Sequence, residues 1–182
     1  MSLDAIEQHY FDYLDVDEVG ADEADPVDAV RILRFESESL GFTTFVTLGL
    51  SESGVTAIQP QELLCSVLPG QDGAADYLVR TCARMVLSAR AGFVDEDIIP
   101  SDGPLLARTR MHGVVTVSHP RLADEFNVVF GPDESITANL ITLLPITDKE
   151  VALGRGTSVD ALFEALEATE EDLLDVTRRS AV

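Results

Sequence analysis

One long amphipathic helix in the middle of the chain is the feature that most constrains the fold. Between residues 74 and 91, apolar side chains recur at helical spacing and form one continuous face, made by Leu78, Cys82, Met85, Val86 and Ala89. Gly92 follows and predicts the C-terminal cap of this helix. The arginines of the segment point elsewhere, which favours a solvated face over an anion site. The segments on either side of the helix then decide the fold class.

Short apolar segments bounded by glycine and proline lie on both sides of this helix and predict β-strands. We expect them at residues 30–35, 42–50, 62–68, 105–107, 113–117, 126–130 and 136–144, with Pro145 ending the last. Short turns between consecutive strands favour antiparallel pairing. The predicted fold is therefore α+β: a mixed, mainly antiparallel sheet flanked by helices, in a single domain over residues 29–182.

The two ends of the chain predict further helices. At the N-terminus, residues 3–14 carry one apolar stripe, and the stretch Asp15–Asp28 is expected to be an acidic loop, so that residues 1–28 precede the domain as helix and loop. Towards the C-terminus, Thr147, Thr157 and Thr169 are each followed three residues later by an acidic residue. This spacing is typical of a capping box and predicts a helix start at each threonine.

Charge limits the partners that such a chain can have. With 33 acidic and 12 basic residues its formal net charge is −21, which argues against binding nucleic acid or an anionic membrane. Neither a signal peptide nor a membrane span is recognisable, so a cytoplasmic location is expected. Residues 1–30 hold ten acids and no Lys or Arg. The acidity indicates either adaptation to the solvent or a surface for a basic protein partner, whose candidate residues are Asp12, Asp15, Asp17, Glu18, Asp22, Glu23, Asp25 and Asp28.

Glu62 is the one unusual residue of the predicted strands, because it leads an otherwise apolar segment. A carboxylate that enters a core strand needs a partner, and Arg108 or Arg110 could supply a buried ion pair. A functional contact is the alternative. Cys65 and Cys82 lie in apolar segments and are expected to be buried thiols, although a disulfide between them stays open.

No catalytic, metal or cofactor site is predicted. Ser51 lacks the second glycine of a nucleophile elbow, and His9, His112 and His119 have no partner at metal-ligand spacing. The alternative is an enzymatic or ligand-binding pocket that gathers Glu62, His112 and His119. A structural protein that forms oligomers, such as a homodimer, is a third hypothesis.

Three blocks in order, residues 45–51, 62–69 and 140–150, resemble the suppressor-of-fused domain family, specifically its short bacterial members. The resemblance covers residues 28–168. It implies a non-enzymatic protein-binding domain that needs no cofactor, and bacterial members resemble immunity proteins that neutralise a cognate toxin. The acidic surface then favours a basic, nuclease-like toxin domain as the partner. No ligand residue is implied, because the three blocks are core strands and helix caps.

Overall fold

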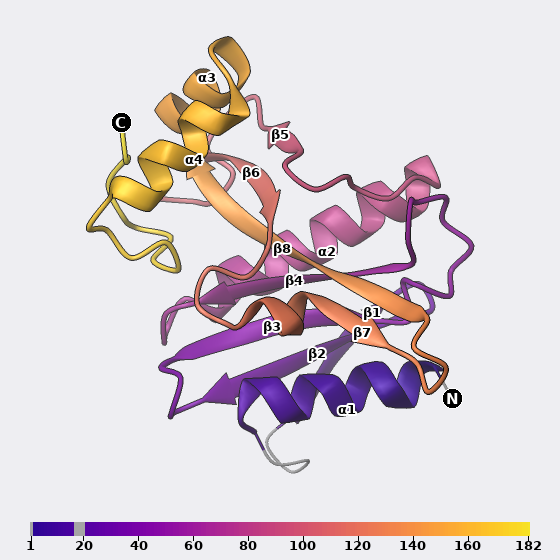
Figure 1. The fold of residues 1–182 in the computed structure, drawn as a ribbon. Helices are drawn as coiled ribbons and strands as arrows, with labels where there is room; N and C mark the ends of the chain where they lie inside the picture. Colours follow the sequence, from indigo (N-terminus) through magenta and orange to yellow (C-terminus); the bar gives the residue numbers. More distant parts are fainter. Residues whose placement is uncertain (1, 17–20) are drawn as a thin grey trace.

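A mixed β-sheet forms the centre of the computed structural model, which describes residues 2–16 and 21–182. Within these residues the sheet has eight strands in the order β1-β2-β3-β4-β8-β6-β5, and β7 pairs with β8 outside this path (Figure 1). The strands are β1 (Ala21–Val27), β2 (Val30–Ser37), β3 (Phe42–Leu48), β4 (Gln61–Val67), β5 (Ile98–Pro100), β6 (Met111–Val117), β7 (Val128–Phe130) and β8 (Ile136–Thr147). The β4–β8 pair is parallel and the others are antiparallel, which confirms the predicted fold class.

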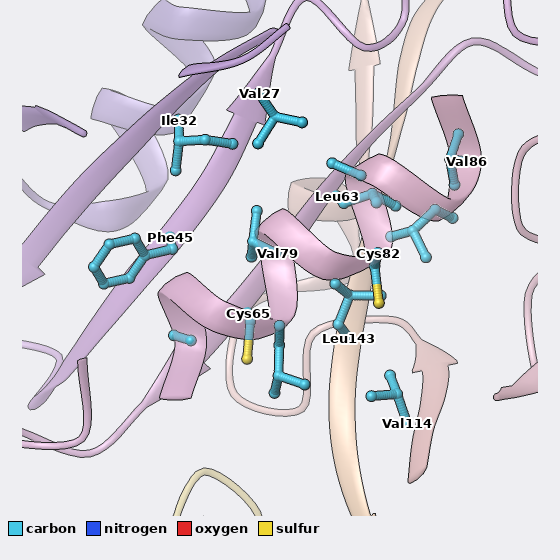
Figure 2. Packing of buried hydrophobic residues seen from close by; sticks show 14 of the residues in the cluster. Val27, Ile32, Phe45, Leu63, Cys65, Val79, Cys82, Val86, Val114 and Leu143 are labelled. Carbon is cyan, nitrogen blue, oxygen red and sulfur yellow. The ribbon is translucent and has the colours of Figure 1, made fainter. Parts of the chain in front are cut away.

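Two helices cover opposite faces of the sheet and explain two of its three core clusters. Helix α1 (Ser2–Leu14) packs Ile6, Tyr10 and Leu14 on one face, and α2 (Asp72–Ala89) packs its apolar stripe on the other (Figure 1). Figure 2 shows Cys65 of β4 beneath Val79 and Cys82 of α2. Helix α1 follows its predicted stripe. Helix α2 buries Leu78, Cys82 and Val86 as predicted, but Met85 and Ala89 are exposed. The buried face of α2 is completed by Ala75, Val79 and Ala83, one step around the helix from the predicted stripe.

A third cluster lies at one end of the sheet. Here α3 (Asp148–Gly156) and α4 (Val159–Ala168) lie over the ends of β6 and β8, and Leu162 and Leu166 are buried against Leu144. The capping box at Thr147 is present, with its side chain accepting from Glu150 N and its amide donating to the Glu150 carboxylate. Helix α4 instead begins after Ser158, whose side chain accepts from Ala161 N at 3.1 Å. No helix begins at Thr169 in the described structure.

The acidic stretch predicted to be a loop contains strand β1. Aspartate and glutamate are depleted in strands, but β1 is an edge strand with β2 as its neighbour, and charge on an edge is compatible with a sheet. The three-residue strand β5 was not predicted, and residues 105–107 form turns and bends instead of the expected strand. Helix α2 is capped by Arg90 at φ 51°, two residues before the predicted Gly92.

Strand β8 also continues through Pro145, where its end was predicted. The partner strand β4 pairs only with residues 139–142 of β8, so this side of β8 has no strand neighbour at Pro145. The Pro145 carbonyl accepts from Arg178 Nη2 at 3.1 Å on that side. In a strand, the N–H and the C=O of one residue face the same way. The nitrogen of Pro145 therefore faces away from β6, and its missing N–H removes no hydrogen bond between β8 and β6.

Candidate functional site

Glu62 is fully buried at the start of β4, and its carboxylate is held by the end of β3 and the turn after it. It accepts hydrogen bonds from Thr47 Oγ1 at 2.6 Å, from the amides of Gly49, Leu50 and Ser51 at 3.0, 3.2 and 3.0 Å, and from Ser51 Oγ at 2.7 Å. Gly49 has φ +107°, a conformation that glycine adopts readily and that lets neighbouring amides converge on one anion. The carboxylate is thereby solvated by the protein itself.

Arg108 and Arg110 do not take part in this arrangement. Both are exposed in the loop before β6, and the hydrogen bonds described for Glu62 go to the turn at residues 47–51 instead. The predicted ion pair is therefore replaced by amide and hydroxyl donors. Sequence reasoning found that Glu62 needs partners, but the partners come from a turn whose geometry has no charge signature.

His119 is a second buried polar group on the same face of the sheet. Its Nδ1 accepts from the amides of Arg121 and Leu122 at 3.2 and 3.1 Å, and its Nε2 lies 2.9 Å from Ser66 Oγ. Because Nδ1 accepts, Nε2 carries the proton and donates to Ser66. Burial, with a smaller contribution from the Arg121 charge, lowers the pKa of His119 to about 4. The imidazole is therefore neutral and serves as a structural hydrogen-bonding group.

The pocket proposed from sequence to gather Glu62, His112 and His119 is not formed. Ser66, the partner of His119, lies four residues beyond Glu62 on β4, which corresponds to about 13 Å along a strand. His112 is half-buried at the other end of the domain, where it lines a cavity with Thr147 and Lys149.

Metal and thiol chemistry find no support in the side chains that the structure describes. No group of three or more His, Cys, Asp or Glu among them could hold a metal ion. Cys65 and Cys82 are buried free thiols. Burial raises the pKa of Cys65 far above its ordinary value and that of Cys82 to about 12. Both sulfurs are therefore protonated and behave as core residues.

Arg178 forms a fully buried ion pair with Glu150, which sequence reasoning missed. Its Nη1 and Nη2 donate to the two carboxylate oxygens at 2.6 and 2.9 Å. The amide of Ala181 adds a hydrogen bond of 2.7 Å to the same carboxylate. Burial alone would raise the pKa of Glu150, but the hydrogen bonds from Arg178, Ala181 and Thr147 outweigh it and hold this pKa below its ordinary value.

This ion pair is one of the anchors of the C-terminal segment, residues 169–182, which follows α4 without regular helix or strand and is called the strap hereafter (yellow in Figure 1). A second anchor joins the strap to the start of α2. Gln71 donates to Asp175 Oδ1 at 2.7 Å and accepts from Val176 N at 3.0 Å, and Leu68 N donates to Leu174 O at 3.3 Å. The strap is thus a fixed part of the domain surface.

A cavity of about 860 Å³, hereafter the C-terminal groove, opens between the strap, α4, the end of β6 and the turn at residues 94–97. Its apolar floor is formed by Val117, Leu144, Phe163, Leu166, Leu173 and Leu174. Its rim carries six carboxylates, those of Asp95, Glu96, Glu167, Glu170, Glu171 and Asp172. Arg121 is the one cation among the lining residues, and it is paired with Asp172. The groove is therefore both apolar and strongly negative.

Among the described residues, the acidic candidates from the N-terminal region do not line this groove. Asp12 and Asp15 are exposed at the end of α1, and Asp15 accepts from Ser39 Oγ. Asp28 is exposed in the turn between β1 and β2, with φ 54°. Asp17 and Glu18 lie outside the described residues. The remaining three lie on edge strand β1: Asp22, Glu23 and Asp25.

Comparison with known proteins identifies the family. The family model described as suppressor of fused protein (SUFU) matches residues 23–179, which extends the resemblance seen in the sequence at both ends. The chain belongs to the suppressor-of-fused family. This is a protein-binding, non-catalytic family. None of the curated proteins matches the chain significantly in sequence.

Solved structures of SUFU proteins share the fold. A SUFU homologue from Neisseria gonorrhoeae FA 1090 is 13% identical with a TM-score of 0.70, and the match covers 98% of this chain and 96% of that one. The match to the Sufu–Fu complex structure has 12% identity, a TM-score of 0.67 and coverage of 98% and 90%. Drosophila Suppressor of Fused matches at 13% identity and a TM-score of 0.66, and this chain spans half of it. No helix in the described part of this SUFU protein is long and apolar enough to cross a membrane.

Proposed function

We propose that this SUFU protein is a non-catalytic cytoplasmic binding domain that neutralises a cognate toxin by binding the toxin's basic domain. Membership of a protein-binding family supports binding, as does the likeness to a structure solved as a Sufu–Fu complex. The observation that carries the toxin hypothesis is the net charge of −21. A strongly acidic protein attracts a basic partner over distance and speeds their association.

The fit to a nuclease-like toxin follows from the same charge. A domain that cleaves nucleic acid presents a basic surface to phosphates, and an acidic protein can cover that surface in their place. The acidic residues of the N-terminal region, from Asp12 to Asp28, are one proposed contact surface. In this proposal the chain acts by occupying the partner's surface and needs no chemistry of its own.

Co-production in bacteria tests this function. The gene beside that of this protein is first tested for a basic, nuclease-like toxin domain. That domain is then induced in cells with and without the SUFU protein, and growth is measured together with binding in a pull-down from the same lysate. We expect growth to be restored and both proteins to be recovered together. If growth stays arrested and the toxin passes through the column, neutralisation is contradicted. Elution of the SUFU protein alone as a stable homodimer would instead favour a structural oligomer.

A further inference from the structure

We propose that the C-terminal groove holds a segment of the protein partner in which one or two large apolar side chains are flanked by Lys or Arg. This inference rests on the proposed protein-binding function and names the surface and the partner chemistry. It stands on the shape, the lining and the charge of the groove.

The floor of the groove is suited to apolar side chains. Phe163 and Leu173 are only half-buried there, beside Val117 of β6. A volume of about 860 Å³ lies within the range of sites that enclose several side chains or a small ligand. Water against this floor gains little hydrogen bonding, so an apolar side chain that replaces it is favoured.

The rim selects the charge of the segment. Asp95 and Glu96 on one wall and Glu167 and Glu170 on the other are exposed, and none of these carboxylates has a partner in the described structure. Because Arg121 is already paired with Asp172, it does not neutralise these four carboxylates, and each can pair with a Lys or Arg of the bound segment. An acidic or neutral segment would meet repulsion or leave them unpaired. A second copy of this chain, itself at −21, is disfavoured for the same reason.

The two walls are held in place before any partner arrives. Thr116 of β6 fixes the turn at residues 94–97: its Oγ1 accepts from Asp97 N at 2.8 Å and donates to Val94 O at 2.7 Å. The opposite wall is α4 and the strap, which Glu150 and Arg178 anchor. Preorganised carboxylates lose little freedom on binding, which favours affinity.

Charge reversal on one wall tests the groove. The double variant Glu167→Lys/Glu170→Lys is compared with the control Glu38→Lys/Glu164→Lys, which has the same net charge and changes exposed acids outside the groove, one of them on the same helix. The probe is a fluorescein-labelled peptide, Lys-Arg-Leu-Phe-Arg-Lys, alongside versions with Ser for Leu and Phe or with Glu for the basic residues. Binding is followed by fluorescence anisotropy at low and physiological salt, and thermal unfolding shows that both variants are folded.

We expect the groove variant to bind the peptide at least tenfold more weakly than the unmodified protein, and the control to change affinity less than twofold. Both altered peptides should bind at least tenfold more weakly to the unmodified protein. Equal losses in the two variants would reveal a general field effect and overturn the inference, as would unchanged binding by the groove variant.

The toxin assay separates this inference from the proposed function. If the groove variant neutralises the toxin as well as the unmodified protein does, the groove is not the contact and the inference fails while the function stands. If the unmodified protein itself fails to neutralise the toxin, the proposed function fails, and the peptide measurement still decides whether the groove takes a basic apolar segment.

Discussion

Two fully buried carboxylates, those of Glu62 and Glu150, are both stabilised by hydrogen bonds, but the donors differ in charge and in their distance along the sequence. Glu62 is surrounded by neutral donors from one turn, residues 47–51, which lies 11 to 15 positions away in sequence. Glu150 is paired with a guanidinium 28 positions away, on the strap. One carboxylate is solvated by many weak donors, and the other by one strong partner with a few amides in support.

The difference determines what each carboxylate does for the fold. The donors of Glu62 hold the turn after β3 against β4. Because β3 and β4 are already neighbouring strands, this site stabilises two elements that the sheet itself has paired. Glu150 ties the last residues of the chain to the start of α3, which places the strap and with it one wall of the C-terminal groove. Local solvation secures the core, while the distant ion pair builds the proposed binding surface.

Removing Arg178 should have the largest effect. Arg178→Ala leaves the Glu150 carboxylate buried without its charged partner, and breaking a buried pair in this way costs about 3–5 kcal/mol in the free energy of unfolding. The end of the strap should also loosen, with faster amide hydrogen exchange at residues 177–182, while the contacts of Gln71 still hold Asp175 and Val176. Chemical denaturation and hydrogen exchange measure the two effects.

Arg179→Ala is the matched control, because this neighbouring side chain is exposed. It should change stability by less than about 0.5 kcal/mol. If Arg178→Ala destabilised the protein no more than this control, the ion pair would not be what anchors the strap, and the contrast between the two carboxylates would fail.

A pH titration extends the comparison to His119, whose Nδ1 is bound by loop amides much as Glu62 is. Its pKa of about 4 lies below the ordinary value near 6.5 for an unfolded chain, so the unfolded state takes up a proton first as pH falls. The stability from neutral His119 is complete above pH 6.5 and is lost between pH 6.5 and 4. The difference corresponds to about 3 kcal/mol.

The variant His119→Leu isolates this contribution, because His9, whose pKa burial also lowers, would act in the same direction. Denaturation midpoints measured from pH 7 to pH 5 should fall in the unmodified protein and flatten in the variant. Glu150 contributes only at lower pH, since its pKa is held below the ordinary carboxyl value. Equal slopes in the two proteins over this range would show that His119 is not held neutral by the fold.

The elements that sequence predicts well are those whose signal is local. The stripes of α1 and α2 and the apolar segments of β3 and β4 repeat within a few residues, so each can be found without its neighbours. Strand β1 could not be found in this way, because its acidic sequence is tolerated only at a sheet edge. Strand β8 can include Pro145 because no strand of the described structure pairs with β8 on that side at this position. The sequence around Pro145 does not reveal this missing neighbour.

Functional features were harder to predict, because they combine distant segments. Glu62 is recognisable as a carboxylate in need of partners, yet backbone amides leave no mark in the sequence. Arg178 resembles any other charge near the C-terminus until Glu150 is brought to it. The C-terminal groove joins residues 95 to 174, and its acids could be assigned to helix capping when considered segment by segment.

The smallest expected effect comes from trimming the donors of Glu62. Ser51→Ala removes one hydroxyl donor, but the amide of Ser51 and three other donors remain, so the loss should be about 1 kcal/mol in the free energy of unfolding. Thr47→Val should cost more, because Thr47 Oγ1 also accepts from Leu63 N at 2.8 Å. Urea denaturation of the two variants measures both.

A loss from Ser51→Ala as large as that from Arg178→Ala would mean that Glu62 depends on a single partner after all. A small loss would establish that shared solvation by several donors tolerates the removal of one, whereas a single buried ion pair does not.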